Sequence, residues 1–423
     1  MKILVVGGGG REHAIIKKIK ENPDVKEIFA LPGNGGIAAD ATCVDIKATD
    51  LSGVKDFAVK EHVDFAVVAP DDPLVLGMVD ELEAAGIPCF GPNKRAAIIE
   101  GSKAFSKELM KDFGIPTAKY QIFDDFTGAS AYVSENPVPI VIKADGLALG
   151  KGVIIAETHD EALNALKTIM KDKLFGDSGN RVVIEEFLEG PEVSVLAFTD
   201  GERIVPMISS MDHKRAFDGD IGPNTGGMGV IAPNPYYTKE IAERAMNDIF
   251  LPTLKAMNSL GRPFKGCLYF GLMITADGPK VIEYNCRFGD PEAQAVLPLL
   301  ESDLLEIMMD VREGKLDSSK VRFSGDFTCC LVLASKGYPK AYEKGFAISW
   351  NDEETRDIFV AGAKLENNCL VTNGGRVLGI TKKGGTLKEA IDKAYKAAES
   401  INFKNKYFRK DIGHKALKVL REV

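Results

Sequence analysis

The sequence predicts a multidomain protein of the α/β and α+β classes, and three observations support this prediction. The chain has 423 residues, so at roughly 150 residues per domain we expect two to four domains. Short apolar runs alternate with amphipathic stretches through the N-terminal part, which predicts a doubly wound parallel sheet. With 45% hydrophobic and 27% charged residues, the composition is that of a folded globular protein.

The N-terminal domain is expected over residues 1–101. Its strands are predicted at 3–6, 27–31, 65–69 and 87–90, and its helices from residue 11, near 51–61 and at 74–85. The run Gly114-Ile115-Pro116 follows a predicted helix at 103–113 and ends it. A smaller unit with strands at 140–143, 152–156 and 181–187 then indicates an inserted lid.

The remaining sequence predicts a body and a final domain. Long strands at 193–199, 268–275 and 280–285, with a helix at 239–260, form the α+β body on which the lid closes. From about residue 321, strands at 328–334 and 376–381 and a helix at 387–400 predict a small C-terminal α/β domain. We therefore place the domain boundaries at 1–101, 102–320 and 321–423, with the lid at 117–188 and the body at 189–320.

Charge and cysteine content exclude several classes of protein. The net charge of −8 argues against a general affinity for nucleic acid or anionic lipid, so any bound phosphate requires local positive groups. The seven cysteines form no CxxC pair, and the five histidines lie too far apart for a zinc site. We find no signal peptide and no apolar run of about 18 residues. We expect reduced thiols, a cytoplasmic location, and no membrane or nucleic-acid partner.

The first strand runs into the glycine-rich loop Gly7-Gly8-Gly9-Gly10-Arg11-Glu12-His13. A dinucleotide site is disfavoured, because Glu12 occupies the third fingerprint glycine position and the second strand ends without an acidic residue. Two interpretations remain open. Glycines before a helix expose N–H groups that suit a phosphate, with Arg11 adding charge, whereas the same residues also make a purely structural turn.

A second glycine cluster spans residues 141–153. It is not a Walker A loop, because Gly146 and Gly150 are one residue too close and Gly152 stands where Ser or Thr would bind magnesium. The glycines join two strands, and Lys143 projects toward whatever this flap covers. Flexible N–H donors with Lys143 and Lys151 fit phosphoryl transfer. A solvated basic hairpin is the alternative.

The strand that ends at Arg287 carries a third signal. Side chains alternate along a strand, so Glu283, Asn285 and Arg287 share one face. A carboxylate and an amide oxygen suit Mg²⁺, and Arg287 beside them suits a carboxylate or phosphate. An ordinary solvent-exposed face is the alternative. Similarly, the glycine-rich loop 222–229 after residues 212–215 is either an anion site or a plain surface loop.

Lys103 after Gly101-Ser102, Lys143 before the flap, the linker 185–188 and Glu283-Tyr284-Asn285 together resemble the ATP-grasp fold. More narrowly, the whole chain resembles the phosphoribosylamine–glycine ligase family. The matching segments are 9–14, 32–34, 90–92, 101–105, 143–152, 212–215, 222–229, 285–292 with Gln294, and 409–413. The resemblance implies a pre-ATP-grasp N-terminal domain, an ATP-grasp domain with a mobile lid, and a C-terminal domain.

The resemblance also implies an activity: ATP-dependent joining of glycine to 5-phosphoribosylamine through a glycyl phosphate, in purine synthesis. The cofactors it implies are ATP and Mg²⁺ or Mn²⁺, and the partners are the two small-molecule substrates. We expect a monomer or a weak dimer. Rival hypotheses are another ATP-grasp carboxylate–amine ligase or carboxylase, a dinucleotide-dependent oxidoreductase, and a catalytically silent nucleotide-binding regulator.

Site residues follow from the same resemblance. Those expected to bind ATP are Lys103, Lys143, Gly146, Gly150, Lys151, Gly152, Glu185, Glu186, Leu188 and Glu192, and the metal ligands are Glu283 and Asn285. Those expected near the substrates are Gly9, Arg11, Asn34, Asp212, Lys214, Arg215, Gly227 and Arg287. The catalytic residues are expected to be Arg287, Asp290 and Lys143. Two departures from the family pattern are Asp71, in a loop near the amine site, and Gly271, where many ATP-grasp enzymes have a further metal-binding Glu.

Overall fold

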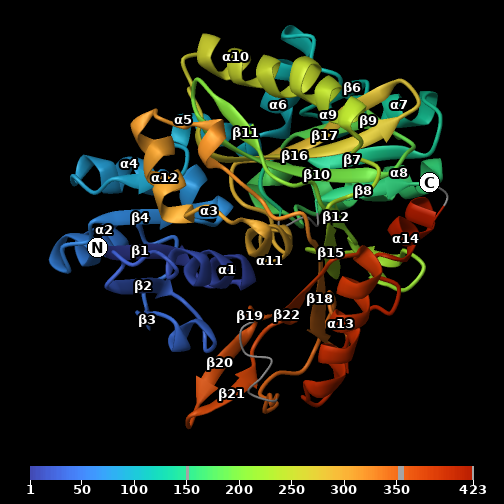
Figure 1. Cartoon of the computed structure of the whole chain (residues 1–423). Helices are drawn as coiled ribbons and strands as arrows, with labels where there is room; N and C mark the ends of the chain where they lie inside the picture. Colours follow the sequence, from blue (N-terminus) through green and yellow to red (C-terminus); the bar gives the residue numbers. More distant parts are fainter. Residues whose placement is uncertain (149–151, 351–356, 422–423) are drawn as a thin grey trace.

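The computed structural model describes residues 1–148, 152–350 and 357–421. Figure 1 shows the N-terminal sheet on one side, the strands of the lid and body above it, and the C-terminal sheet below. In the part of the chain described, no helix is long and apolar enough to cross a membrane. The predicted multidomain α/β and α+β class is confirmed.

The N-terminal sheet has five parallel strands in the order β3-β2-β1-β4-β5. Its strands are β1 (Lys2–Gly7), β2 (Glu27–Pro32), β3 (Thr42–Cys43), β4 (Phe65–Val68) and β5 (Cys89–Phe90). Its helices are α1 (Gly10–Ile19), α2 (Leu51–Lys60), α3 (Asp71–Leu76), α4 (Met78–Ala84) and α5 (Lys94–Gly101). The strand order reverses between β1 and β4, the switch point at which doubly wound folds bind ligands. Arg11 and Asp71 follow these two strands directly.

The predicted continuous helix at 74–85 is wrong. The chain forms α3 and α4 instead, separated by Gly77. Gly77 has a φ of 102°, in the left-handed region that an α-helix cannot contain. The apolar periodicity continues across this break, which is why the pattern alone predicted one helix.

The lid is a separate antiparallel sheet in the order β6-β9-β7-β8. Its strands are β6 (Tyr120–Phe123), β7 (Ile140–Ala144), β8 (Val153–Ala156) and β9 (Val182–Glu186), and its helices are α7 (Phe126–Glu135) and α8 (His159–Leu166). These elements enclose an apolar core of their own. Helix α6 (Lys103–Asp112) connects the N-terminal domain to the lid.

The body sheet has the order β11-β10-β16-β17. Its strands are β10 (Glu192–Asp200), β11 (Ile204–Pro206), β16 (Lys265–Thr275) and β17 (Gly278–Asn285), accompanied by the helices α9 (Lys239–Ala245), α10 (Leu251–Ser259), α11 (Glu292–Val296) and α12 (Leu304–Glu313). The helix predicted at 239–260 is interrupted, because residues 246–250 form a wider π-helical turn between α9 and α10. Strand β17 carries the predicted metal ligands.

A six-stranded sheet joins the body to the C-terminal domain. It contains β12 (Met211–Asp212), β15 (Gly229–Ala232), β18 (Phe327–Ser335), β19 (Ile358–Val360), β22 (Arg376–Gly384) and β23 (Lys406–Tyr407). Two hairpins, β13 (Arg215–Phe217) with β14 (Ile221–Asn224) and β20 (Ala363–Glu366) with β21 (Cys369–Thr372), and the helices α13 (Leu387–Ser400) and α14 (His414–Arg421) complete it. Because β15 pairs with β18, this sheet crosses the boundary that we placed at residue 321.

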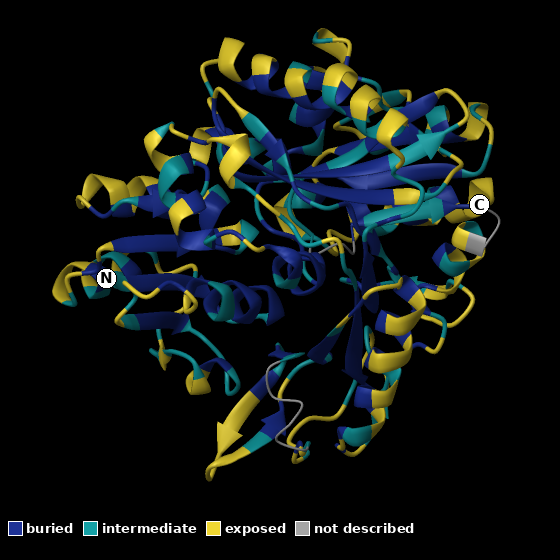
Figure 2. Ribbon diagram, viewed as in Figure 1, coloured by how far each residue is buried: buried dark blue, intermediate teal, exposed yellow. Residues whose placement is uncertain are grey.

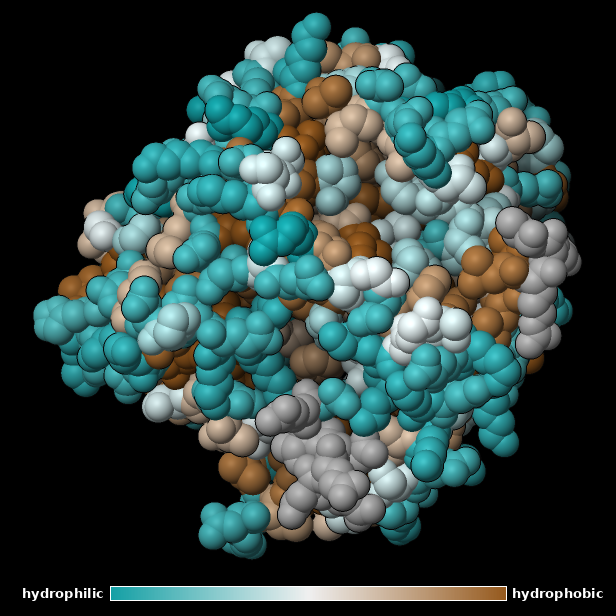
Figure 3. Space-filling view, viewed as in Figure 1, coloured by the Kyte–Doolittle hydropathy of each residue, from teal (hydrophilic) through white to brown (hydrophobic). Residues whose placement is uncertain are grey.

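Burial follows these sheets. Figure 2 shows the strands of the N-terminal, body and C-terminal sheets mostly buried, and the outer turns of helices such as α10 and α13 exposed. The face in Figure 3 is largely hydrophilic, with apolar side chains gathered mainly in the recesses between polar ones. Polar residues that are nevertheless buried, such as Lys107, Lys143 and Glu185, therefore require a specific explanation.

Candidate active site

One cavity of about 1040 Å³ lies where the N-terminal domain, lid, body and C-terminal domain meet. Each part contributes charged or polar side chains to its wall: Arg11, Asp71 and Glu100 from the first, Lys143 and Glu185 from the lid, Lys214, Glu283, Asn285 and Arg287 from the body, and Tyr338 and Arg376 from the C-terminal domain. The site is therefore complete only when these separately folded units lie together.

Two of the predicted lysines enter this cavity from adjacent elements. Ser102 caps helix α6 by accepting a hydrogen bond from Phe105 N at 3.1 Å, which places Lys103 in the first turn. Lys103 Nζ donates to the Gly146 carbonyl at 2.9 Å, and Lys143 Nζ on β7 donates to the Ile282 carbonyl at 3.0 Å. Burial lowers the pKa of Lys103. The two ammonium groups thus approach the end of β17 from the lid side.

Glu185 pairs with two buried lysines. Its Oε1 lies 2.8 Å from Lys143 Nζ, and its Oε2 lies 3.0 Å from Lys107 Nζ. Burial lowers the pKa of Lys107 to about 8. Lys107 was not predicted, although its spacing of four from Lys103 places both side chains on one face of α6. The side chain of Glu185 is consequently engaged with cations.

The linker after β9 lines the cavity. Glu186, Leu188 and Glu192 all contribute to its wall, as does Gly152 from the flap. Gly146 instead packs against Ser178, whose Oγ would lie 2.4 Å from an added Cβ. The predicted residues Gly150 and Lys151 lie outside the described residues.

Glu283 and Asn285 line the cavity from strand β17. Lys214 Nζ lies 3.4 Å from Glu283 Oε1 and 3.3 Å from Glu192 Oε2. The charge of Lys214, aided by Lys143 and Lys103, lowers the pKa of Glu283 to about 2. Opposite Glu283 stands Gly271, where an added Cβ would lie 3.0 Å from Glu283 Cγ. Gly271 thus leaves room for the ionised carboxylate.

The donor set at β17 fits Mg²⁺. Within residues 1–148, 152–350 and 357–421, no group of three or more His, Cys, Asp or Glu could hold a metal. One carboxylate with one amide oxygen, both hard ligands, suits an ion that takes its other ligands from water and phosphate. An all-protein zinc site would need four ligands, often including thiolate or imidazole.

Arg287 lies two residues beyond the end of this strand, where acidic residues hold its guanidinium. Its Nη2 lies 2.9 Å from Glu100 Oε1 and 3.9 Å from Asp71 Oδ2. Its Nε is buried and has no hydrogen-bond partner within the described part of the chain. Burial opposes ionisation of Asp71, but the charges of Arg287 and Arg11 outweigh it and lower the Asp71 pKa. Glu100 was not predicted, because the sequence around it in α5 contains no motif that distinguishes a functional glutamate from an ordinary helical one.

Asp290 faces Arg376, a third residue that was not predicted. Arg376 Nη2 lies 3.4 Å from Asp290 Oδ1, and Arg376 Nη1 donates to the Asp290 carbonyl at 2.8 Å. Gln294 Nε2 donates to Asp290 Oδ1 at 2.8 Å. Burial raises the pKa of Asp290, but Arg376 and Arg11 outweigh burial and lower it overall. Arg376 follows two glycines at the start of β22, a signal that sequence analysis did not use.

Asp212, at the end of β12, is half-buried and feels the charge of Glu292. Burial and the charge of Glu292 raise the pKa of Asp212 well above its usual value. Gly227 has a φ of 108°, and a Cβ there would lie 2.5 Å from Asp212 Oδ1. Gly227 therefore makes space for Asp212. Arg215 lines the cavity, and its Nη1 donates to the Gly222 carbonyl at 2.8 Å across the β13–β14 hairpin.

The N-terminal loops place one predicted residue at the cavity. Arg11 lines it and donates from Nη1 to the Phe288 carbonyl at 3.2 Å. Gly9 N instead donates to Glu12 Oε2 at 2.6 Å, and Asn34 Nδ2 donates to the carbonyls of Gly8 and Val360. Gly9 and Asn34 thus fix the loops around Arg11.

Three family models match the chain: phosphoribosylglycinamide synthetase N domain over residues 1–100, its ATP-grasp (A) domain over 101–293 and its C domain over 328–415. A phosphoribosylamine–glycine ligase from Caldanaerobacter subterraneus subsp. tengcongensis is 47% identical over 97% of this chain and 99% of the relative. The enzyme of that name from Halalkalibacterium halodurans is 47% identical over 99% of this chain and 97% of the relative.

Solved structures agree with these matches. The crystal structure of a phosphoribosylamine–glycine ligase from Thermotoga maritima is similar with a TM-score of 0.85 and 34% identity, covering 97% of this chain and 100% of that one. A biotin carboxylase domain from Hydrogenobacter thermophilus, at 16% identity and a TM-score of 0.72 over 96% of this chain and 91% of that one, shares the fold. The chain therefore belongs to the phosphoribosylglycinamide synthetase family.

Proposed function

We infer that the chain joins glycine to 5-phospho-D-ribosylamine with hydrolysis of ATP, giving N1-(5-phospho-D-ribosyl)glycinamide, ADP and phosphate in purine biosynthesis. The observation that carries this inference, beside family membership, is the four-part cavity in which Lys103 and Lys143 face Glu283 and Asn285. Cations and hard oxygen ligands at one place suit transfer of a phosphoryl group.

In the first step, a carboxylate oxygen of glycine attacks the γ-phosphorus of ATP, and ADP leaves. We propose that Lys103 and Lys143 bind the phosphates, while residues 185–192, with Gly146, Gly150, Lys151 and Gly152 of the flap, enclose the nucleotide. When bound by Glu283 and Asn285, Mg²⁺ neutralises charge on the transferred phosphoryl group. Mn²⁺ is the alternative ion that the same two ligands would accept.

In the second step, the amine of phosphoribosylamine attacks the acyl carbon of glycyl phosphate, phosphate leaves, and the amine loses a proton. We propose that Arg287 orients the glycine carboxyl group, since its buried Nε–H has no hydrogen-bond partner among the described residues. We propose that Asp212 binds the glycine ammonium group, whose positive charge would offset the effect of burial and Glu292 on the Asp212 pKa, and that Asp290, held by Arg376, acts beside the reacting groups. Closure of the lid keeps water from the acyl phosphate.

We propose that Arg11 contacts the phosphate of phosphoribosylamine and that Gly9 and Asn34 shape the loops that present it. Lys214 and Arg215 complete the substrate side of the cavity, and Gly227 leaves space for Asp212 there. We also propose a cytoplasmic enzyme that acts as a monomer or a weak dimer.

The test is ADP release measured with glycine and freshly prepared phosphoribosylamine, each omitted in turn. We expect sustained ADP release, over many turnovers, only when both substrates and Mg²⁺ are present; glycine alone can give at most one ADP per enzyme molecule. ADP release with bicarbonate and biotin in place of both would instead indicate a carboxylase, and release without any acceptor would contradict a ligase.

A further inference from the structure

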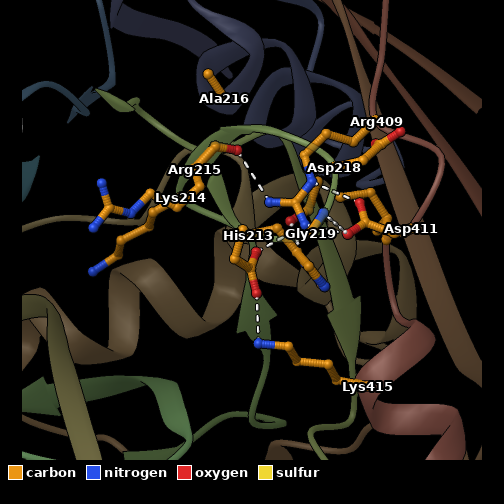
Figure 4. A network of polar contacts seen from close by, with 12 residues as sticks. His213, Lys214, Arg215, Ala216, Asp218, Gly219, Arg409, Asp411 and Lys415 are labelled. Atoms are coloured by element: carbon orange, nitrogen blue, oxygen red, sulfur yellow. Dashed lines mark hydrogen bonds and ion pairs between the residues drawn. The ribbon is translucent and has the colours of Figure 1, made fainter. Parts of the chain in front are cut away.

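A C-terminal segment, residues 407–415, contacts the segment 213–220 that leads through the β13–β14 hairpin (Figure 4). Arg409 stands at its centre with a side chain 1% exposed. Its Nε and Nη2 lie 2.8 Å from the two carboxylate oxygens of Asp411, and Nη2 lies 2.8 Å from Asp220 Oδ1. Its Nη1 donates to the Arg215 carbonyl at 3.0 Å. One guanidinium thus joins the two segments.

Further hydrogen bonds run between the same two segments. Backbone N–H groups and a phenol make them: Gly219 N to Asp411 Oδ2 at 2.8 Å, Lys410 N to Asp218 Oδ1 at 2.7 Å, and Tyr407 Oη to the Ala216 carbonyl at 2.9 Å. The first strand of the hairpin and its turn are therefore held by residues near the C-terminus of the chain.

His213 is part of the same arrangement. Gly413 N donates to His213 Nε2 at 3.1 Å, so this nitrogen carries no proton and Nδ1 donates to the Gly229 carbonyl at 3.0 Å. Burial lowers the pKa of His213 to about 4, which keeps the imidazole neutral near pH 7. Both ring nitrogens of His213, the residue before Lys214, are therefore hydrogen-bonded.

The hairpin and the two residues before it contribute five residues to the cavity wall: His213, Lys214, Arg215, Asp220 and Asn224. Lys214 and Arg215 extend away from the Arg409 network in Figure 4, and both line the cavity. Lys214 Nζ reaches Glu283 and Glu192 there. Arg409 is not among the described residues that line the cavity. Any effect of Arg409 on the reaction therefore passes through the hairpin.

We propose that Arg409, with Asp411 and Asp220, is a positioning residue that holds the β13–β14 hairpin so that Lys214 and Arg215 meet glycine and phosphoribosylamine. This proposal rests on the proposed function. Within the described residues, Arg409, Asp411 and Asp220 make no hydrogen bond or ion pair with the flap or with the linker 186–192. The hairpin segment touches that linker through the Lys214–Glu192 pair. Loss of the network should therefore affect the two acceptor substrates more than the nucleotide.

The test compares Arg409→Lys and Asp411→Asn with Lys410→Ala, all in the full-length chain. Arg409→Lys keeps the charge but loses the planar fork, and Asp411→Asn keeps the size but loses the bidentate pair. Lys410 is the matched control, because it adjoins Arg409, has an exposed side chain, and uses only its backbone N–H in the network. ADP release gives KM for glycine and phosphoribosylamine, and calorimetry gives the Kd of MgADP.

We expect both network variants to raise the two KM values by about tenfold or more, as small misplacement of positioning groups does. The Kd of MgADP should change severalfold less than the two KM values, because Lys214 touches Glu283 and Glu192 while the lysines proposed to bind the phosphates keep their places, and Lys410→Ala should match the unmodified chain. Unchanged KM values in both variants would overturn the positioning role, and so would a parallel loss of MgADP binding, which indicates a general structural role. Failure of the unmodified chain to release ADP with both substrates would instead refute the proposed function.

Discussion

Replacing Glu283 by Gln tests the metal assignment, because Gln keeps the size of the side chain and removes its charge. In the folded chain the pKa of Glu283 falls from 4.5 to about 2, chiefly because Lys214 lies 3.4 Å away. That fall corresponds to about 3 kcal/mol in favour of the ionised form. Since the side chain is 30% exposed, solvent screening reduces the figure to about 2 kcal/mol. Glu283→Gln should lower the free energy of unfolding by no more than this.

The effect on turnover should be much larger than the effect on stability. Glu283 is the only carboxylate of the proposed metal pair, so its loss should lower Mg²⁺-dependent kcat by about 10²-fold or more. Without Mg²⁺, ADP should bind as well as to the unmodified chain or more tightly, because a negative charge beside the phosphates is gone. ADP release over a Mg²⁺ titration and calorimetry with ADP measure the two effects.

The matched control is Asp277→Asn, at the turn that joins β16 to β17. Asp277 is 84% exposed and pairs with Lys280 at 3.4 Å, so its loss should change neither turnover nor stability appreciably.

Ionisation of Glu283 should also make the free energy of unfolding depend on pH in the acid range. Its contribution is fully present above pH 4.5 and is lost as the pH falls toward 2. An unchanged Mg²⁺ titration with kcat near that of the unmodified chain would refute the assignment.

Three further predictions concern the other side of the cavity. Lys143→Ala should raise the Kd of ATP by about 10- to 100-fold, the worth of a charge-assisted hydrogen bond, and unchanged ATP binding in calorimetry would contradict it. Gly227→Ala should raise KM for glycine, since the new Cβ would lie 2.5 Å from both Asp212 Oδ1 and Pro291 Cδ, whereas Gly86→Ala, also at a positive φ, meets open space and should cost only about 1 kcal/mol of backbone strain. Equal glycine KM values in the two variants would count against this reasoning. The pKa of His213 is about 4 in the folded chain and 6.5 in the unfolded chain. Between these two pH values the unfolded chain binds more protons, so the free energy of unfolding should fall as the pH drops from 6.5 to 4. His213→Asn should remove that part of the slope in chemical unfolding at several pH values, and an unchanged slope would contradict it.

The fold could be predicted largely because its signals are local. Alternation along residues 281–287 correctly places Glu283, Asn285 and Arg287 together at the cavity, although Ile282 and Tyr284 also reach its wall. Breaks inside helices were not predicted, since Gly77 interrupts a continuous apolar pattern with one left-handed residue.

Residues that act through long-range partners could not be predicted in the same way. Arg376 reaches Asp290 across 86 positions of sequence, and Glu100 reaches Arg287 across 187. Neither residue stands in a local pattern that distinguishes it from an ordinary surface charge. For Asn34 the motif resemblance predicted a place near a substrate. In the structure its amide group instead donates hydrogen bonds to two backbone carbonyls.

Lys107 accounts for how an acidic chain can release a lysine to an anionic ligand. The chain carries a net charge of −8, and in its cavity Lys143 is already paired with Glu185. If Lys143 were the only partner, turning it toward a phosphate would leave a buried carboxylate unpaired, which is costly. Because Glu185 Oε2 also lies 3.0 Å from Lys107, the carboxylate keeps one cation when Lys143 turns. The overall charge therefore describes the outer surface, while the cavity depends on the local exchange of ion-pair partners.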